Sequence, residues 1–582
     1  MKKFYILALF GLGDCLSAIC RLKSVKQKYP EYEIVFFLGG FGRSPQLSKE
    51  QLELEGYKAN IINNFTYHGQ LFQIEEFLKK SILKEGDILE DWSFCNEIFN
   101  NQEAYNWKYE FEYPYNYVNE LTVNPDKKKY QKIEEIQNLF LDKTKKYIGI
   151  KPLTKSGNAE GFSNDLAAGR FWTKENWYKL ADLIVEKNHI LVVFGINDED
   201  WEICDYLNSK NVVYVDYRNR SVQEVQDCLK YLDAFIGTNS FEWEITSRHK
   251  RKIPTYCMFF KNSFFIENHV PHNQEFYDTC YIDTDSSSTP EQVLETVEYM
   301  MEHKKRPEID YSIAMITKND SDCIEETLNK ITPYIVDDLV IVHGGDIVND
   351  GVYDSTVEKI IRNFEKHSEN IDKSFKDFLQ SSEKKGIYLS RKRESYIDEY
   401  NEEQQIWNIN KNKEHCYLVF KKWFDDFSIQ KNYALSLCKN KWKILLDADE
   451  WLDTYSFEML PWILWKSEKE KIDCISLSRI NTLNNLSDDE LRQYCQKQGW
   501  KLGGCFGNHI NWPDLQRRIF YGDEIHYVGK CHEQITEFKK EKIMLHHPIH
   551  HHKSKERQEI GLKREQFLYE KKANEVYKMI YE

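Results

Sequence analysis

The stretch KWKILLDADEW, residues Lys441–Trp451, joins a short apolar run to a group of acidic residues. The apolar part, Trp442–Leu446, has the length and composition of a buried β-strand, and Asp447 and Asp449 follow it directly. Ligands of parallel sheets gather where the strands end, so both carboxylates are expected at a binding edge. Two carboxylates at i and i+2 suit a hard cation, Mg²⁺ or Mn²⁺. An acidic turn that only ends a strand would read the same way, so the surrounding sequence decides.

Strand-like and helix-like patterns alternate upstream of this segment. Apolar runs at Tyr311–Thr317 and Asp338–Gly345 read as strands, and Cys323–Ile331 and Ser428–Cys438 read as helices. Such alternation is typical of an α/β domain built on a parallel sheet.

The N-terminal part of the chain repeats this pattern twice. A strand at Phe4–Phe10, a GLGD turn, a helix at Asp14–Tyr29 and a strand at Glu33–Gly39 form a βαβ unit. A second series begins at Lys145–Pro152 and reaches Ile253–Phe259. Both read as Rossmann-like domains.

The sequence therefore predicts three domains in an α/β chain. Two Rossmann-like domains span 1–142 and 143–306, and a mixed α/β domain spans 307–582, after a polar linker that ends near Asp310. A charged segment at about 364–414 has little strand pattern and reads as an insertion into the third domain.

The composition limits the classes of function. A chain of 582 residues exceeds what one core normally holds, and a net charge of −15 argues against a protein that binds nucleic acid by neutralising phosphates. The 14 cysteines include no CxxC pair, which is typical of reduced, buried thiols in a cytoplasmic protein rather than of a zinc ribbon. An aromatic content of 14% fits a sugar-handling cleft, although large cores alone account for it equally well.

The first residues, MKKFYILALFGLGD, superficially resemble a signal peptide. Their apolar run is short and enters a glycine turn without a small-residue cleavage site, so we expect a buried first strand. No stretch approaches the roughly 18 apolar residues of a membrane span. Any membrane contact is expected to be peripheral, through an acceptor.

The C-terminal domain resembles the family-2 glycosyltransferases, which have a GT-A fold, in particular the lipopolysaccharide-core glucosyltransferases. Four segments carry this resemblance in order: SIAMITKNDSDCIEETL (Ser312–Leu328), ITPYIVDDLVIV (Ile331–Val342), DDFSIQKNYALSLCKNKWKILLDADEWL (Asp425–Leu452) and WPDLQRRIFYGDEIHYVGKCHEQI (Trp512–Ile535). The resemblance implies an inverting, metal-dependent sugar transfer from a nucleotide-sugar donor to a glycan or glycoconjugate acceptor.

The same resemblance implies roles for individual residues. Asp449 would be the principal metal ligand, and Asp447 would contact the metal or the nucleotide sugar. Glu533 would be the general base that deprotonates the acceptor hydroxyl, with His532 beside it, because an ordinary carboxylate is ionised at neutral pH. The remaining donor contacts would come from Asp320, Asp338, Lys431 and Asn432.

Two features of this half leave alternatives open. The turn after the second strand has His343 where the family commonly has an aspartate, so that role falls to Asp346 or Asp354. The run LHHPIHHHK contains His546 and His550, either of which would complete the metal shell, since neutral imidazole suits Mn²⁺. A solvated histidine cluster is the competing interpretation.

The N-terminal half resembles the family-9 heptosyltransferases, which have a GT-B fold. FGLGDCLSAICRLKSVKQKYPEYEIVFF matches their opening segment and implies that Asp14 is the catalytic base. GRFWTKENWYKLADLIVEKNHILVVFG matches their second domain, where Arg170 would face the donor phosphate. A lone Gly-x-Gly turn would otherwise indicate only a tight strand-to-helix connection.

The donor loop of this half departs from the family pattern. In GTNSFEWEITS, Asn239 replaces an aspartate, Ser240 is kept, Phe241 replaces a glycine and Glu244 stands near the usual histidine. A bulky Phe prevents close approach of the backbone, and a Glu repels a diphosphate.

Three hypotheses follow for the whole chain. The first is a fusion of two glycosyltransferases that add sugars in succession, where tethering raises the local concentration of the intermediate. The second is a single active GT-A transferase with a non-catalytic, GT-B-like binding or assembly module. A modifier of hydroxymethylated DNA bases is a third hypothesis, which the net charge of −15 disfavours.

Overall fold

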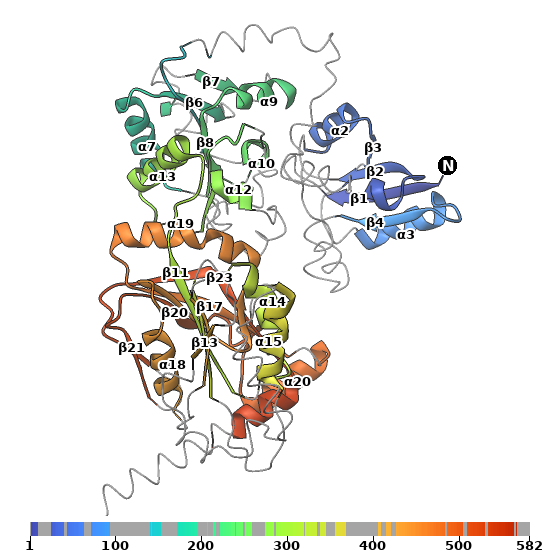
Figure 1. Ribbon diagram of the computed structural model, residues 1–582. Coiled ribbons are helices and arrows are strands. Elements are labelled where there is room, and N and C mark those ends of the chain that lie inside the picture. Colours follow the sequence, from blue (N-terminus) through green and yellow to red (C-terminus); the bar gives the residue numbers. More distant parts are fainter. Residues whose placement is uncertain are drawn as a thin grey trace, which may run out of the picture. The chain divides into compact units, whose positions relative to one another are not determined.

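The computed structural model divides the chain into two compact units, Met1–Arg306 and Pro307–Glu582. It describes residues 2–9, 22, 25–39, 44–62, 71–92, 140, 142–152, 172–195, 206–207, 213–216, 222–238, 240–247, 249, 251–258, 274–284, 287–318, 320–334, 338–344, 355–367, 406–408, 415–420, 426–483, 486–503, 509–529, 534–563 and 566. The predicted α/β class is confirmed, because strands that pair in parallel alternate with helices along the chain in both units (Figure 1).

The first unit begins with a four-stranded parallel sheet in the order β3-β2-β1-β4. Its elements are β1 (Lys3–Leu9), β2 (Glu33–Gly39), α2 (Ser44–Leu54), β3 (Lys58–Ile61), α3 (Leu71–Ser81) and β4 (Ile88–Asp91). Tyr5, Val35 and Leu78 belong to the core that α3 closes against the sheet. The opening residues thus form the predicted strand, paired in parallel with the next one.

The second sheet of this unit has six parallel strands in the order β10-β9-β8-β5-β6-β7. Its elements are β5 (Tyr147–Lys151), α7 (Lys174–Glu186), β6 (Ile190–Gly195), β7 (Val213–Asp216), α9 (Val222–Lys230), β8 (Ala234–Thr238), α10 (Phe241–Ser247), β9 (Thr255–Met258), α12 (Gln274–Thr279), β10 (Cys280–Asp283) and α13 (Pro290–His303). The strand order reverses between β5 and β8, and such a reversal is where doubly wound sheets bind ligands.

Local sequence explains how these elements begin and pack. Thr289 and Gln292 form a capping box at the start of α13, and Pro290 occupies its first turn. A Cβ atom at Gly149 in β5 would stand 2.5 Å from a methyl carbon of Leu232, so a larger residue there would force Leu232 to move.

The second unit is built on a nine-stranded mixed sheet in the order β13-β14-β12-β11-β15-β20-β17-β23-β16. Its main elements are β11 (Tyr311–Thr317), α14 (Ile324–Ile331), β12 (Asp338–His343), α15 (Thr356–His367), β13 (Ile406–Asn408), β14 (His415–Phe420), α18 (Phe427–Ser436), β15 (Trp442–Asp447), β16 (Glu450–Leu452), α19 (Thr454–Glu470), β17 (Cys474–Leu483), α20 (Asp488–Gln498), β20 (Asp514–Tyr521) and β23 (Glu541–Lys553). Two small ribbons, β18 (Leu502–Gly503) with β19 (His509–Ile510) and β21 (His526–Val528) with β22 (Gln534–Thr536), complete it.

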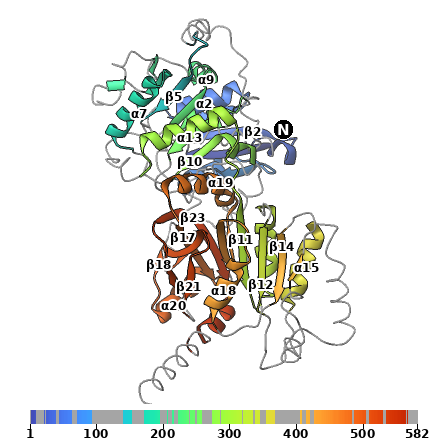
Figure 2. The ribbon, with the colours of Figure 1, turned by 60° about the vertical axis from the view of Figure 1, so that its left-hand side comes forward.

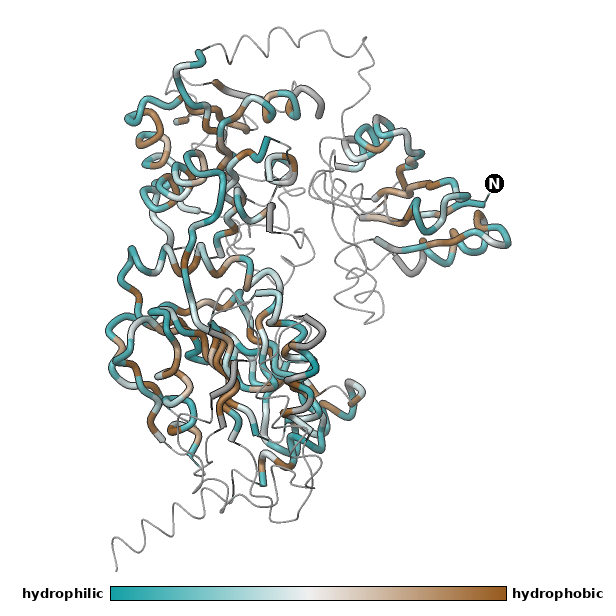
Figure 3. Tube along the Cα trace, viewed as in Figure 1, coloured by the Kyte–Doolittle hydropathy of each residue, from teal (hydrophilic) through white to brown (hydrophobic). Residues whose placement is uncertain are grey.

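The sheet of the second unit changes character at its centre. Strands β14, β12, β11 and β15 are parallel, whereas β20 runs antiparallel to both β15 and β17. Helix α18 lies on one face, and the pair α14–α15 lies on the other (Figures 1 and 2). Ala314, Val340, Ala434 and Leu445 form part of the core between α18 and the sheet. Hydrophobic residues concentrate along the strands of this sheet (Figure 3).

The predicted insertion at about 364–414 lies mostly outside the described residues. The described parts of it are the end of α15 and the short strand β13, which pairs antiparallel with β14. In the described part of the chain, no helix is both long and apolar enough to cross a membrane.

Candidate functional site

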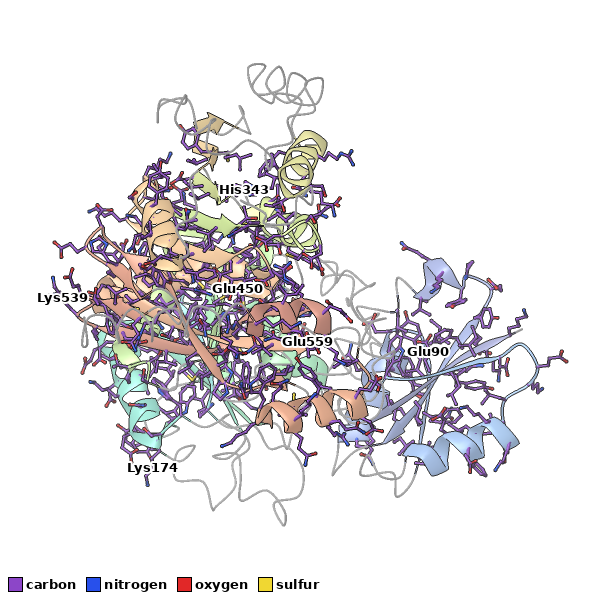
Figure 4. The ribbon with its side chains drawn as sticks, turned by 90° about the horizontal axis from the view of Figure 1, so that it is seen from below. Glu90, Lys174, His343, Glu450, Lys539 and Glu559 are labelled. Atoms are coloured by element: carbon purple, nitrogen blue, oxygen red, sulfur yellow. The ribbon has the colours of Figure 1, made fainter. Side chains whose placement is uncertain are left out.

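Two aspartates end the central strand of the second unit. β15 is the fifth of nine strands and pairs in parallel with β11, where Asp447 lies opposite Ile316. A two-residue turn then leads into β16, so Asp447, Asp449 and Glu450 all stand at the carboxyl edge of the parallel strands. Figure 4 shows Glu450 inside the second unit, among its strands. This placement agrees with the strand-end position expected from the sequence.

Two buried cations hold the carboxylate of Asp447. The Nη2 atom of Arg518, in β20, donates to Oδ2 at 2.8 Å. The Nζ atom of Lys431, in α18, lies 3.5 Å from Oδ1. The side chains of Arg518 and Lys431 are only 3% and 4% exposed, so both charges are fixed parts of the core.

The ion pairing continues from Asp447 into the sheet. Arg518 also donates from Nη2 to Oε1 of Glu450 at 2.8 Å, and Arg479 reaches the same oxygen at 2.9 Å. Arg479 then donates to Oδ2 of Asp514 through Nε and Nη2. Burial alone would raise the pKa of Glu450, but Arg518 and Arg479 hold it well below its ordinary value. Glu450 is therefore ionised and orients both arginines.

Asp449 has different partners, which come from the end of β23 and from the helical residues that follow it. His551 Nε2, Lys553 Nζ and Arg557 Nη2 lie 3.4, 3.5 and 3.4 Å from its Oδ2 atom. Burial alone would raise the pKa of Asp449, but the positive charges of Lys553 and Arg557 keep it well below the ordinary value. Asp449 is thus a buried carboxylate that stays ionised.

The hydrogen bonds of Asn481 determine which nitrogen of His551 carries a proton. The amide nitrogen of Asn481 donates to Asp514 at 2.8 Å and to Ile510 O at 3.3 Å, so its oxygen faces Nδ1 of His551 at 2.6 Å. That oxygen can only accept, which assigns the proton to Nδ1. Burial lowers the pKa of His551, so the ring is neutral and the lone pair on Nε2 points at the carboxylate of Asp449. Two acceptors then face each other across 3.4 Å.

Asp320 joins this group through Arg557. The guanidinium donates from Nη2 to Oδ1 of Asp320 at 2.5 Å, and its Nη1 binds Asp322. The other oxygen of Asp320 accepts from Thr317 Oγ1 at 2.8 Å and from the Lys318 amide at 2.6 Å. Burial raises the pKa of Asp320 to about 6, with Arg557 opposing the rise and Asp449 adding to it.

The structure does not bring every predicted residue to this group. Asp338 begins β12 and so lies at the opposite edge of the sheet, where it binds Ser312 Oγ and accepts from the Lys439 amide at 2.8 Å. The side-chain amide of Asn432 donates to the backbone oxygen of Tyr527 and accepts from its backbone N–H. His343 ends β12 as a buried side chain. Asp338 and Asn432 therefore hold loops and strands in place.

The histidine beside Asp449 is neither of the two that the sequence singled out. His550 stacks on Trp451 with ring centroids 5.9 Å apart, and its Nε2 lies 3.9 Å from Asp453. In β23, His551 and Lys553 alternate with His550 and His552, so only the first pair faces Asp449. The histidine that lies next to Asp449 is therefore His551, and the metal roles expected for His550 and His546 remain predictions.

Several predicted residues lie outside the described part of the chain: Asp14, Arg170, Asn239, Asp346, Asp354, His532 and Glu533. Ser240 is described just after β8, and within the described part of the chain its buried hydroxyl oxygen has no hydrogen-bond partner. Near it, Lys151 ends β5 and forms a buried ion pair with Glu242 at 3.1 Å. These residues stand where the strand order reverses.

The residues that sequence analysis missed are mostly cations: Arg479, Arg518, Lys553 and Arg557, together with Glu450 and His551. Arg518 was inside the quoted segment WPDLQRRIF, and His551 and Lys553 were inside LHHPIHHHK. Strand alternation was the available signal, but it gives two equivalent faces until the neighbouring strands are known.

The fit of a divalent cation depends on Asp449 and His551. Among the described residues, no group of three or more His, Cys, Asp or Glu side chains is arranged as a complete metal site. Cis ligands of an octahedral ion with bonds of about 2.1 Å stand about 3 Å apart, close to the separation of Asp449 Oδ2 and His551 Nε2. A histidine fixed through its other nitrogen is also the usual arrangement at metal centres. The pair fits a Mg²⁺ or Mn²⁺ ion that takes its other ligands from substrate.

No protein-family profile matches this sequence, and no curated protein matches it. Solved structures match at low identity. The E. coli heptosyltransferase WaaC with ADP-2-deoxy-2-fluoro heptose is 11% identical, with a TM-score of 0.31, over 51% of this chain and 99% of that chain. The E. coli ADP-heptose lps heptosyltransferase II is 13% identical, with a TM-score of 0.33, over 52% of this chain and 99% of that chain.

A third solved structure, the glycosyl transferase family 9 protein from Veillonella parvula, gives a similar result. It is 12% identical, with a TM-score of 0.35, over 52% of this chain and 98% of that chain. All three TM-scores lie below 0.5, so these likenesses assign no activity. The family-2 resemblance of the C-terminal unit remains a prediction from the sequence.

Proposed function

We propose that the C-terminal unit transfers a sugar from a nucleotide-sugar donor to the hydroxyl of a glycan or glycoconjugate, with inversion and with Mg²⁺ or Mn²⁺. The observation that carries this proposal is the 3.4 Å approach of Asp449 Oδ2 to His551 Nε2 at the carboxyl edge of β15. A cation between the two groups would relieve the repulsion of two acceptors. The family-2 resemblance of the flanking segments supplies the reaction class.

The described residues are proposed to have two roles in donor binding: some hold the metal ion and others orient Asp447. Asp449 and His551 would hold the ion, with Asp447 next to it. When bound, the ion would neutralise the charge that develops on the leaving nucleoside diphosphate. Arg518 and Lys431 keep the Asp447 carboxylate in one orientation, so the site needs little rearrangement when the donor binds.

The acceptor side of the reaction rests on the sequence. Glu533 is proposed as the general base that takes the proton from the acceptor hydroxyl, with His532 beside it. Inverting transfer needs no covalent sugar–enzyme intermediate, so one base and one stabilised leaving group suffice.

For the N-terminal unit, the proposal is a second transferase with Asp14 as base and Arg170, Asn239 and Ser240 near its donor. The hydroxyl of Ser240 is buried beside the strand-order reversal and has no hydrogen-bond partner among the described residues, which supports a ligand there.

One observation favours the alternative, a non-catalytic binding or assembly module. Lys151 stands at the end of β5, where a donor phosphate would lie, but it is buried in an ion pair with Glu242. A lysine whose charge is already met by a carboxylate attracts a diphosphate less strongly.

Separate substitutions in the two units test both proposals. The full chain, with Asp449→Asn or Asp14→Asn, is assayed by mass spectrometry for hydrolysis of a panel of nucleotide sugars with and without Mn²⁺. Asp449→Asn is expected to lower the Mn²⁺-dependent hydrolysis by about 100-fold or more, because the ion loses its charged ligand. Asp489→Asn is the matched control, since Asp489 is an 87% exposed aspartate on α20.

Two outcomes would reject these assignments. Mn²⁺-dependent hydrolysis that survives in Asp449→Asn removes the proposed site of the C-terminal unit. If Asp14→Asn leaves hydrolysis of every donor intact, the N-terminal unit is the binding module rather than a second enzyme.

A further inference from the structure

The segment 551–557 brings two full positive charges to a carboxylate that is proposed to bind a metal ion. Lys553 Nζ and Arg557 Nη2 both lie within 3.5 Å of Asp449 Oδ2, the oxygen that also faces His551. A divalent ion on that oxygen would stand next to both cations. Like charges at such distances repel, so the ion and these two side chains compete for Asp449.

The exposure of these cations separates them from the pair that holds Asp447. Lys553 and Arg557 are 23% and 19% exposed, whereas Lys431 and Arg518 are buried. Cations with access to solvent can also reach a ligand that enters from solvent. A planar guanidinium and a mobile ammonium are the two side chains that proteins use to bind phosphate oxygens.

We propose that Lys553 and Arg557 are the diphosphate-binding residues of the C-terminal site, which neutralise Asp449 until a nucleoside diphosphate and its metal ion arrive. This inference rests on the proposed function. Upon binding, the ion takes Asp449 and the two cations turn to the diphosphate oxygens, so the net charge of the group changes little.

Arg557 has a second anchor that keeps it at the site through this exchange. Its Nη2 atom donates to Asp320 Oδ1 at 2.5 Å, and its Nη1 atom binds Asp322, so release of Asp449 leaves the guanidinium in place. Asp320 is itself fixed by Thr317 and by the Lys318 amide. The guanidinium is therefore held by β11 and the turn after it, independently of Asp449.

If the metal ion and the two cations compete for Asp449, removing a cation should change the affinities for the metal ion and for diphosphate in opposite directions. Removing either cation frees Asp449 for the metal ion and deprives the diphosphate of a partner. A purely structural role for Lys553 or Arg557 would instead weaken the binding of both ligands together.

The test measures each ligand alone by titration calorimetry on the full chain, with MnCl₂ in one series and metal-free inorganic diphosphate in the other. Arg557→Gln and Lys553→Gln are each expected to bind Mn²⁺ about threefold to tenfold more tightly and diphosphate about tenfold more weakly, the range of one charge-assisted contact. Arg557→Lys keeps the charge and is expected to bind Mn²⁺ like the wild type while regaining only part of the affinity for diphosphate.

Lys555→Gln is the matched control, because it removes the same charge from the same segment. Lys555 lies over the ring of Tyr494, 5.8 Å from its centroid. The inference is overturned if Lys553→Gln and Arg557→Gln bind both ligands as Lys555→Gln does, or if both affinities fall together.

Asp449→Asn separates a failure of this inference from a failure of the proposed function. If Asp449→Asn binds Mn²⁺ as tightly as the wild type, the metal site itself is refuted. If that variant loses Mn²⁺ while Lys553→Gln and Arg557→Gln match the control, only the role of the two cations is refuted.

Discussion

Asp447 and Asp449 are two residues apart, yet their surroundings differ. Asp447 is held by Arg518 and Lys431, which are buried in the sheet and in α18. Asp449 is met by side chains from the segment 551–557, and its two cationic partners there are partly exposed. The Asp447 side chain is 27% exposed but is held by two buried cations, whereas Asp449 is only 9% exposed but is met by cations that solvent can reach.

This difference follows from the backbone between them. Asp447 is still the last residue of β15, so its side chain meets neighbours set by strand pairing with β11 and β20. Asp449 lies in the turn before β16, which is the edge strand of the sheet and, among the described residues, pairs with β23 alone. Residues in turns are positioned by fewer constraints, which suits a ligand that must release one partner and take another. Substitutions around Asp447 should therefore change mainly the stability of the fold, and substitutions around Asp449 should change mainly the binding of the ion.

Arg518→Gln should have the largest effect, and the effect should be on stability. The substitution removes the cation that Asp447 shares with the buried Glu450, and leaves them with Lys431 and Arg479 respectively. Removing one partner from a buried ion pair costs about 3–5 kcal/mol. Chemical denaturation monitored by circular dichroism measures the loss. The neighbouring Arg517→Gln is the control, because Arg517 pairs with Glu541 and is 39% exposed, and it should cost about 1 kcal/mol or less. Equal losses for both variants would mean that the buried network does not fix Asp447.

His551→Gln should change ion binding with little change in stability. The variant loses the lone pair that faces Asp449, and removal of one ligand or its orienting partner weakens metal affinity by about 10- to 100-fold. Titration with MnCl₂ on the full chain measures this affinity. His550→Gln changes the adjacent residue of β23, which stacks on Trp451, and should bind Mn²⁺ like the wild type. The assignment of Nε2 fails if the two variants are indistinguishable.

The sequence predicted what is local and missed what depends on register. A strand that ends in Asp447 and Asp449 is visible because its apolar run and the two acids are contiguous. Arg517 contacts Glu541 whereas Arg518 contacts Asp447, and the pairing of β20 with β17 shifts register at this point, which the sequence alone does not reveal. The same ambiguity affected the histidine run, where the neighbouring β16 selects His551 over His550.

The position of Asp338 shows that an acid must follow its strand, not precede it, to reach the binding edge. An aspartate beside an apolar run is expected at a binding edge only if it follows the strand, and Asp338 begins β12. Its buried carboxylate binds Ser312 and the Lys439 amide at the amino end of the parallel strands. The sequence itself places Asp338 before its apolar run, and its donor contact remains a prediction.

A pH titration should show the smallest effect and would sharpen the contrast between Asp449 and Asp320. The pKa of Asp320 is raised to about 6, so its contribution to stability increases as the pH falls from 7 through 6 and is complete near its ordinary value of 3.8. The pKa of Asp449 is lowered, so its contribution is present above pH 3.8 and is lost only in stronger acid.

The measurement is the free energy of unfolding at pH 7 and at pH 5, for the wild type and for Asp320→Asn. Between these values Asp320 should add about 1 kcal/mol to the wild type at pH 5, and the Asn variant should lack this gain. Asp449→Asn should keep only part of the gain in the same window, because burial is the largest cause of the raised pKa of Asp320 and the charge of Asp449 adds to it. A wild type whose stability does not rise relative to Asp320→Asn on acidification would show that Arg557 dominates burial at Asp320, and that the guanidinium is anchored there more firmly than at Asp449.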